Sequence, residues 1–155
     1  MPKRGVEFFI IDILLAIYNV KKISAKMKTA HSFEKNRIAY SAIMHELEII
    51  GEAMKYILTS QSLQPHVKPD WKKIIAFRNI IAHEYFGISS EDVFSIIKDN
   101  IPELEQDFIE LIRKIDDTSD ISFTISAACK DFQKKGWRSE VLYLTKLSKS
   151  LRLDK

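Results

Sequence analysis

Apolar residues recur at helical rather than strand spacing along most of this chain. The clearest stripe steps by three or four positions, through Ile43, Leu47, Ile50, Met54 and Ile57, which is typical of an amphipathic helix with one buried side. The stretch from Val6 to Val20 is denser, and Asp12 and Asn19 share its thin polar edge because seven residues advance a helix by nearly two turns. We expect this first helix to be buried on several sides, inside a bundle or at a dimer contact.

The same pattern predicts four further helices and a C-terminal hairpin. After a basic connection over 21–33, we expect helices over 34–60, 70–86, 89–100 and 101–115. The third helix begins with Asp70 as its N-cap and ends at Gly87, and Ser89 caps the fourth. After the acidic linker 116–120, two short helices separated by Gly136 form the hairpin, although 121–125 is also compatible with a strand.

These expectations define an all-α fold, an up-and-down bundle of about five helices with a C-terminal helical extension. The low content of Gly and Pro, four of each in 155 residues, disfavours a turn-rich β-sandwich or barrel. We expect residues 1–116 to form the bundle domain and residues 117–155 to form the extension.

Composition excludes several classes of protein. The single cysteine, Cys129, cannot build a disulfide framework or a thiolate zinc site, which favours a reducing compartment. Lys3 and Arg4 precede the first apolar stretch as in a signal peptide, but that stretch contains Glu7 and Asp12 and no small-residue cleavage site follows it. It is also too short to span a bilayer. We therefore expect a cytoplasmic protein without a membrane segment.

The net charge of +3 is unevenly distributed. Residues 121–155 contain eight basic and three acidic residues, residues 21–37 contain six basic and one acidic, and residues 91–120 contain ten acidic and three basic. Local positive charge attracts polyanions such as nucleic acids. A solvated helix surface would have the same composition, so charge alone suggests a nucleic-acid partner without establishing it.

The strongest chemical signal is the segment from Arg78 to Tyr85, with Asn79 and His83 between them. An arginine can neutralise the charge of a phosphodiester transition state, and a histidine can transfer a proton near neutral pH. Because RNA supplies its own 2′-hydroxyl nucleophile, this chemistry needs no metal. On a helix Arg78 and Tyr85 share a face, whereas Arg78 and His83 diverge by about 140°, which favours a site shared by two subunits. The alternative is an ordinary ion-pairing arginine and a histidine stabilised at a helix C-terminus.

A second polar group lies on the predicted second helix. His45, Glu48 and Glu52 share a face and could ligate a metal, but they lack the paired E-x-x-H motifs of di-iron bundles. A solvated or cleft-lining face is the simpler interpretation, and Glu52 could instead orient Arg78.

The segment from Arg78 to Tyr85 reads R-N-x-x-x-H-x-Y and resembles the R-x4-H-x-Y signature of HepT-like toxins of the HEPN superfamily. Three other segments, in the same order as in that family, also resemble it: LEIIGEA at 47–53, the P-D-W-K-K-I segment at 69–74, and N-I-P-E-L at 100–104. The last departs slightly from the usual E-D-L-P. The resemblance covers about residues 6–115 and does not include the basic extension.

The resemblance implies a dimeric all-helical ribonuclease toxin whose two motifs line one positively charged cleft, without a metal or other cofactor. Arg78 would bind and stabilise the phosphate, His83 would act as general acid or base, and Asn79 would position one of them. Tyr85 would contact the substrate. It would also be the residue that a nucleotidyltransferase antitoxin modifies with AMP.

Two other interpretations remain open from the sequence. One is a catalytically silent HEPN module that only binds a nucleotidyltransferase. The other is a helical sensor that binds a nucleotide in the cleft lined by Arg78 and His83.

Overall fold

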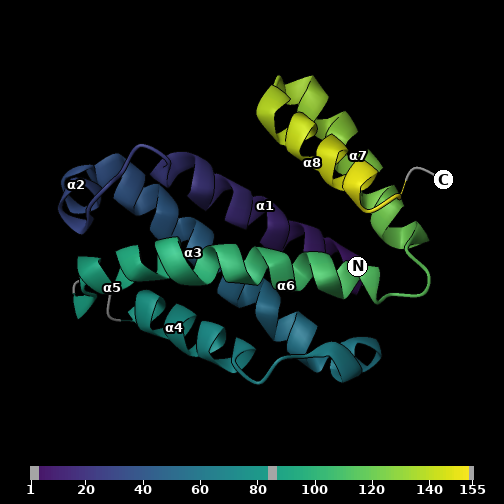
Figure 1. Cartoon of the computed structure of the whole chain (residues 1–155), viewed down its shortest axis with the longest axis horizontal. Helices are drawn as coiled ribbons and strands as arrows, with labels where there is room; N and C mark the ends of the chain where they lie inside the picture. The colour runs from purple at the N-terminus through teal and green to yellow at the C-terminus, as the bar shows by residue number, and fades with distance from the viewer. Residues whose placement is uncertain (1–3, 84–86, 154–155) are drawn as a thin grey trace.

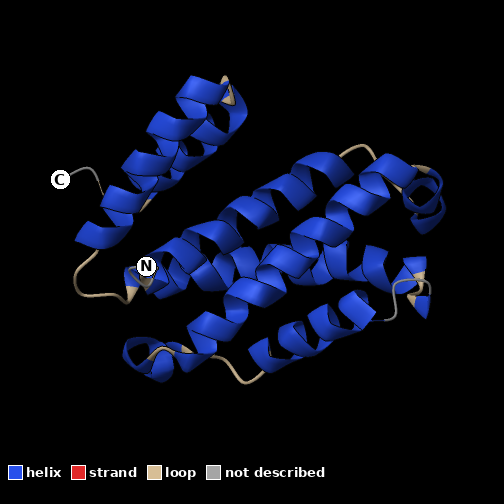
Figure 2. Ribbon diagram, turned by 180° about the vertical axis from the view of Figure 1, so that it is seen from behind, coloured by secondary structure: helices blue, strands red, loops and turns tan. Residues whose placement is uncertain are grey.

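The computed structural model describes residues 4–83 and 87–153, and all regular secondary structure within these ranges is helical (Figure 2). The α-helices are α1 (Val6–Ser24), α2 (Ala30–Lys35), α3 (Arg37–Thr59), α4 (Trp71–His83), α5 (Ser90–Ser95), α6 (Ile101–Arg113), α7 (Ser119–Lys135) and α8 (Arg138–Ser150). A 3-10 helix, η1 (Gln61–His66), precedes α4, and a π-helical turn, η3 (Ile96–Asn100), joins α5 to α6. The predicted all-α helical bundle is confirmed over the described residues.

Helix α1 lies at the centre of the packing. It contacts α3, α6 and α7, and α4 covers α3 on the other side of the bundle (Figure 1). Five α1 side chains are completely buried in the core: Ile10, Ile13, Leu14, Ile17 and Val20. Burial of this apolar surface drives the assembly of the helices, and the expectation that α1 is buried on several sides is confirmed within a single chain.

The predicted second helix over 34–60 was wrong at its start, because the chain forms two helices there. Thr29 and Ser32 cap α2 reciprocally, each side chain bonding to the other's backbone N–H. Asn36 then interrupts the helical conformation, and its side chain accepts a hydrogen bond of 3.1 Å from the Ala39 N–H to cap α3. Asparagine competes for backbone hydrogen bonds in this way. The expected connection over 21–33 is itself partly helical, because α1 extends to Ser24 and α2 begins at Ala30.

Other boundaries agree with the pattern or differ in detail. The connection between the helices predicted over 34–60 and 70–86 contains η1, and the possible strand at 121–125 is helical within α7. Ser89 caps α5, as predicted, by accepting a hydrogen bond from the Asp92 N–H. The break expected near Asn100 is the π-helical turn η3, after which Pro102 lies in the first turn of α6, the position where proline is best tolerated.

Helices α7 and α8 form the predicted hairpin, with Gly136 in the left-handed conformation between them (φ 74°). The hairpin packs beside α1, on the side of the bundle away from α4 (Figure 1). The ring of Tyr143 stacks on that of Tyr18 at 4.5 Å, and Lys22 donates a hydrogen bond of 2.7 Å to the Ser139 hydroxyl. The predicted division of the chain at residue 116 stays a prediction.

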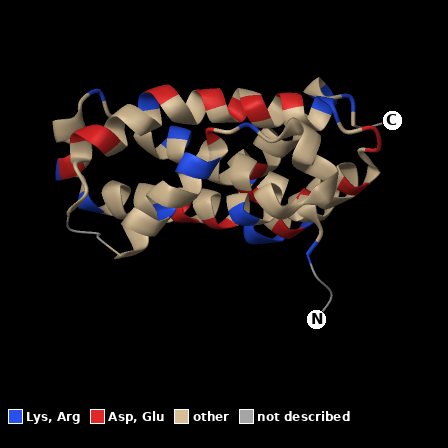
Figure 3. Cartoon of the chain, turned by 90° about the horizontal axis from the view of Figure 1, so that it is seen from below, with Lys and Arg blue, Asp and Glu red and all other residues tan. Residues whose placement is uncertain are grey.

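Lysines and arginines are interspersed with aspartates and glutamates over the bundle in the view of Figure 3. No helix of the described ranges is long and apolar enough to cross a membrane.

Candidate functional site

Helices α3 and α4 run antiparallel and pack closely where Gly51 meets Arg78 (Figure 1). A Cβ atom built on Gly51 would lie 2.2 Å from the Arg78 Cβ and 2.6 Å from its Cγ, which is closer than atoms can approach. The glycine therefore permits the base of the arginine side chain to cross α3. Glycine disfavours a helix interior, so its presence in α3 is explained by this contact.

The Arg78 guanidinium is held by polar side chains from both helices. Its Nη2 atom lies 3.1 Å from Oε2 of Glu52 on α3, and its Nη1 atom donates to Oδ1 of Asn79 at 3.4 Å. The side chain of Arg78 is 27% exposed, so it is partly shielded while its tip still reaches solvent. Its Nε–H is buried and has no hydrogen-bond partner among the described residues.

Glu52 also accepts a hydrogen bond of 2.9 Å from Lys55, one turn further along α3. That hydrogen bond, together with the positive charges of Lys55 and Arg78, holds the pKa of the Glu52 carboxyl below its usual value. One carboxylate thus lies between two cations, and the local charge of the three side chains is positive. Such a group attracts an anion such as a phosphate.

His83 is the last residue of α4 and is exposed, as is Asn79. No hydrogen bond or salt bridge joins it to Arg78 or to any other described residue. This agrees with the divergence expected for positions five residues apart on a helix. Tyr85, the fourth predicted site residue, lies outside the described residues.

The structure therefore brings Arg78, Asn79 and Glu52 together and leaves His83 at the exposed end of the same helix. The orienting role considered for Glu52 is consistent with its salt bridge to Arg78. Sequence reasoning assigned no role to Gly51 or Lys55. Both carry a local signal: a glycine inside a strongly helical pattern points to a close packing contact, and Lys55 follows Glu52 by three positions, the spacing at which opposite charges pair on a helix.

The metal-ligand interpretation of His45, Glu48 and Glu52 finds no support in the geometry. Within residues 4–83 and 87–153, no group of three or more histidine, cysteine, aspartate or glutamate side chains is arranged to hold a metal ion. Glu52 pairs with Arg78 and Lys55, and His45 is exposed on α3.

Comparison with known proteins places this site inside a recognised family. The profile of the family described as Ribonuclease HepT-like matches residues 13–112, a range that includes both α3 and α4. A candidate RNase of Caldanaerobacter subterraneus is 34% identical over 113 residues, which cover 73% of this chain and 96% of the relative. A candidate RNase of Methanocaldococcus jannaschii is 31% identical over 112 residues, covering 72% of this chain and all of the relative.

A protein of Thermococcus cleftensis named as a probable ribonuclease HepT is 29% identical over 113 residues, covering 72% of this chain and 99% of the relative. No solved structure matches the chain significantly. The profile spans well over half of the chain and two relatives exceed 30% identity, so the chain belongs to the HepT-like ribonuclease family of the HEPN superfamily.

Proposed function

We propose that this protein is a metal-independent endoribonuclease, the cytoplasmic toxin of a toxin–antitoxin pair, with Arg78 and His83 as its catalytic residues. The observation that carries the proposal is the environment of Arg78. Its guanidinium is positioned by Glu52 and Asn79, keeps a buried Nε–H without a described partner, and extends from a helix that ends in an exposed histidine. The Arg78 side chain is 27% exposed, so a phosphate oxygen can approach the guanidinium from solvent and accept a charge-assisted hydrogen bond.

The reaction follows from the chemistry of RNA and these two side chains. The ribose 2′-oxygen attacks the neighbouring phosphorus and loses its proton, the bond from phosphorus to the 5′-oxygen breaks, and the leaving 5′-oxygen takes up a proton. His83 accepts or donates one of these protons. Arg78 stabilises the additional negative charge on the phosphate in the transition state. The products are a 2′,3′-cyclic phosphate, which can open to a 3′-phosphate, and a 5′-hydroxyl.

Two further residues have supporting roles in this proposal. Asn79 accepts a hydrogen bond from Arg78 and so orients the guanidinium. Tyr85 follows His83 by two positions in the motif and would contact the substrate. Neither role requires a metal ion or an organic cofactor.

The active form in this proposal is a homodimer. Arg78 and His83 point in different directions from α4, so a second subunit could supply the missing partner of each. Two large aliphatic side chains are exposed on the described parts of the helices that form the site: Ile38 on α3 is 85% exposed and Ile80 on α4 is 46% exposed. The C-terminal end of α4 and the start of α3 lie at the same end of the bundle (Figure 1), so a partner could cover these side chains and His83 together.

Regulation would come from a nucleotidyltransferase antitoxin that transfers AMP to the hydroxyl of Tyr85. The added phosphate would bring negative charge to the motif, seven residues after Arg78 in the sequence, and would compete with the RNA phosphate for its guanidinium. The nucleotide would also fill the cleft sterically.

The test is cleavage of a single-stranded RNA by the purified protein in the presence of EDTA, with the product ends identified by mass spectrometry. We expect cleavage that leaves 2′,3′-cyclic or 3′-phosphate ends, and a rate reduced about 10²- to 10⁴-fold by His83→Ala. The matched control is His31→Ala, because His31 is an exposed histidine on α2, outside the motif.

Two outcomes would contradict the proposal. Strict dependence on added magnesium, or full activity of His83→Ala, would exclude this mechanism. Absence of cleavage by the wild-type dimer, together with tight binding of a nucleotidyltransferase, would instead select the catalytically silent module. Calorimetry with mononucleotides and oligonucleotides would identify a nucleotide sensor, because a sensor would bind a mononucleotide as tightly as an oligonucleotide.

A further inference from the structure

The hairpin formed by α7 and α8 lies outside the region that the family shares. The HepT-like profile ends at residue 112, before α7 begins at Ser119. The hairpin nevertheless has a defined position, because Tyr143 stacks on Tyr18 and Lys22 bonds to Ser139. Burial and the nearby carboxylate of Glu105 raise the pKa of Tyr143, so its hydroxyl stays protonated and donates to Glu105 at 3.5 Å. The outer side of the hairpin is therefore held in a fixed orientation.

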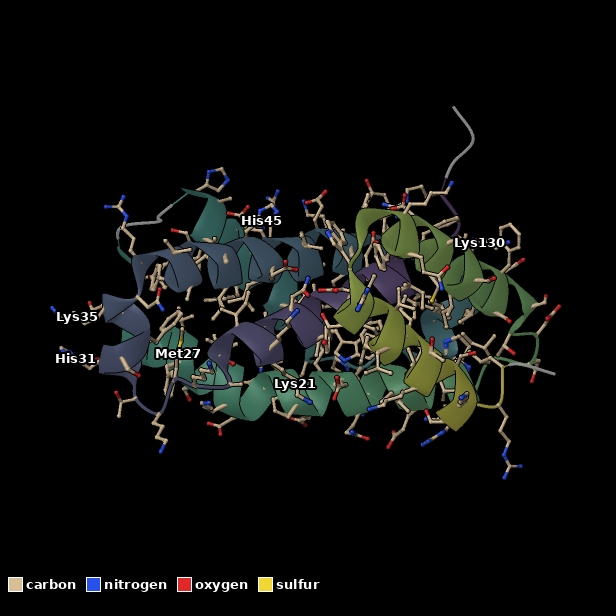
Figure 4. All side chains as sticks on the ribbon, turned by 90° about the horizontal axis from the view of Figure 1, so that it is seen from above. Lys21, Met27, His31, Lys35, His45 and Lys130 are labelled. Carbon is tan, nitrogen blue, oxygen red and sulfur yellow. The ribbon has the colours of Figure 1, made fainter. Side chains whose placement is uncertain are left out.

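Basic side chains outnumber acidic ones on the hairpin helices. Glu140 pairs with Lys22 at 3.5 Å on the side that faces the bundle, Asp131 is exposed and pairs with Lys135 at 2.7 Å, and Asp120 is exposed at the start of α7. Five exposed basic side chains form no salt bridge with any described residue: Lys130, Lys134, Arg138, Lys146 and Lys149. We call these five the hairpin basic surface. Figure 4 shows Lys130 at the end of the molecule opposite His31 and Lys35.

Exposed aromatic side chains accompany this surface. Phe123 on α7 is 72% exposed, and Trp137 between the two helices is 48% exposed. Lys135 lies 4.8 Å from the centre of the Trp137 ring. Phe123 precedes Lys130 by seven residues, nearly two helical turns, so its ring lies on the same side of α7 as Lys130, roughly 10 Å along the helix. Basic side chains that contact phosphates, combined with aromatic rings on which bases stack, are the pattern by which proteins bind single-stranded nucleic acid.

We infer that the hairpin basic surface binds single-stranded RNA and holds the substrate at a distance from the catalytic motif. This inference rests on the proposed function for the identity of its ligand. Because the hairpin lies beside α1 and the motif helix α4 lies on the far side of α3, an RNA must be long to contact both (Figure 1). The hairpin thus selects long, unpaired RNA over short oligonucleotides.

The test measures binding of a fluorescein-labelled, unstructured 20-nucleotide RNA by anisotropy, in a His83→Ala background that keeps the RNA intact. The hairpin variant combines Lys130→Gln, Lys134→Gln and Lys146→Gln. We expect binding about tenfold weaker or more, and a salt dependence reduced by about 0.7 for each phosphate that the variant no longer neutralises. Phe123→Ser alone should weaken binding about fivefold or more, because a base can no longer stack on the ring.

The control variant combines Lys26→Gln, Lys28→Gln and Lys35→Gln, which removes the same charge from the other basic region of the chain. The inference requires that the affinity of this variant fall by less than about twofold. Equal decreases in the two triple variants would show attraction to the overall charge alone, and an unchanged affinity of the hairpin variant would exclude the surface as an RNA site. The inference would also be overturned if the hairpin variant bound phosphatidylserine vesicles more weakly than the parent protein but bound RNA with unchanged affinity.

Cleavage assays with otherwise wild-type protein separate this inference from the proposed function. We expect the hairpin variant to cleave a dinucleotide at the wild-type rate and the 20-nucleotide RNA with a raised KM. If RNA is cleaved but the hairpin variant binds it like wild type, the inference fails and the proposed function stands. If binding depends on the hairpin but no RNA is cleaved, the proposed function fails and the hairpin is an RNA-binding surface.

Discussion

Gly51 and Arg78 touch where α3 crosses α4, at a distance that leaves no space for a side chain on the glycine. This contact determines where the Arg78 side chain leaves α4. It also places the guanidinium beside Glu52, the residue that follows the glycine, at 3.1 Å. The close packing of α3 against α4 therefore fixes the position of the candidate catalytic arginine.

Gly51→Ala should destabilise the fold by about 1–3 kcal/mol, the usual cost of overpacking a close contact, in spite of the better helix propensity of alanine. Urea denaturation would measure the change. Gly87→Ala is the matched control, because a Cβ at Gly87 has no atom within 4 Å, and its stability should stay within about 0.5 kcal/mol of wild type. A Gly51→Ala variant as stable as wild type would show that the helices can separate at little cost.

Glu52→Gln should lower kcat for RNA cleavage about tenfold with little change in KM, because the neutral amide no longer holds the Arg78 guanidinium by charge. The stability should change by less than about 1 kcal/mol, since the pair is partly exposed. Glu52→Asp should recover part of the activity, which a purely structural role would not predict. Glu48→Gln, one turn earlier on α3, serves as control and should retain wild-type kcat.

Glu46→Gln should raise stability at neutral pH and leave it unchanged near pH 4. Burial raises the pKa of the Glu46 carboxyl above its usual value, although the hydrogen bond from Asn19 opposes this. The folded state therefore binds the proton more tightly than the unfolded state, and wild-type stability falls as the pH rises through the two pKa values. Glutamine can still accept the bond from Asn19. Thermal melts of both proteins at pH 4 and pH 7 test this. The prediction is contradicted if the difference in Tm between Glu46→Gln and wild type is no larger at pH 7 than at pH 4.

The proposed dimer should dissociate when a charge is placed on the exposed apolar side chains near the site. Ile38→Asp or Ile80→Asp should convert a micromolar dimer to a monomer in light scattering, because an unpaired charge buried at an interface costs several kcal/mol. Leu142→Asp, at an exposed leucine on α8, should remain dimeric. A wild-type monomer at micromolar concentration would refute the dimer directly.

Tyr85→Phe should escape inhibition by a partner nucleotidyltransferase, because it lacks the hydroxyl that would accept AMP. Co-expression with that partner should add the mass of one or a few AMP groups to the wild-type chain at Tyr85 and abolish cleavage. If intact-mass spectrometry detects no adduct and the partner inhibits Tyr85→Phe as well as wild type, inhibition works by occlusion of the cleft.

The sequence by itself determined the helical class and most of the helix positions. The spacing of Ile43, Leu47 and Ile50 defines the buried side of α3, and Gly136 marks the turn of the hairpin. These features depend on residues three or four positions apart and on the conformational freedom of one glycine, so they can be read locally. The motif from Arg78 to Tyr85 is one short continuous segment, so the sequence also identified the helix that carries the candidate site.

Only the tertiary structure decided how the site is assembled. The salt bridge between Glu52 and Arg78 joins residues 26 positions apart, and the stacking of Tyr143 on Tyr18 joins residues much further apart. Such contacts depend on which helix faces meet and on the distance between the helices. The periodicity of the sequence determines neither the pairing of the faces nor that distance. The interruption at Asn36 was missed because a capping asparagine and a solvent-exposed helical one look alike in sequence, and the packing of the two flanking helices selects between them.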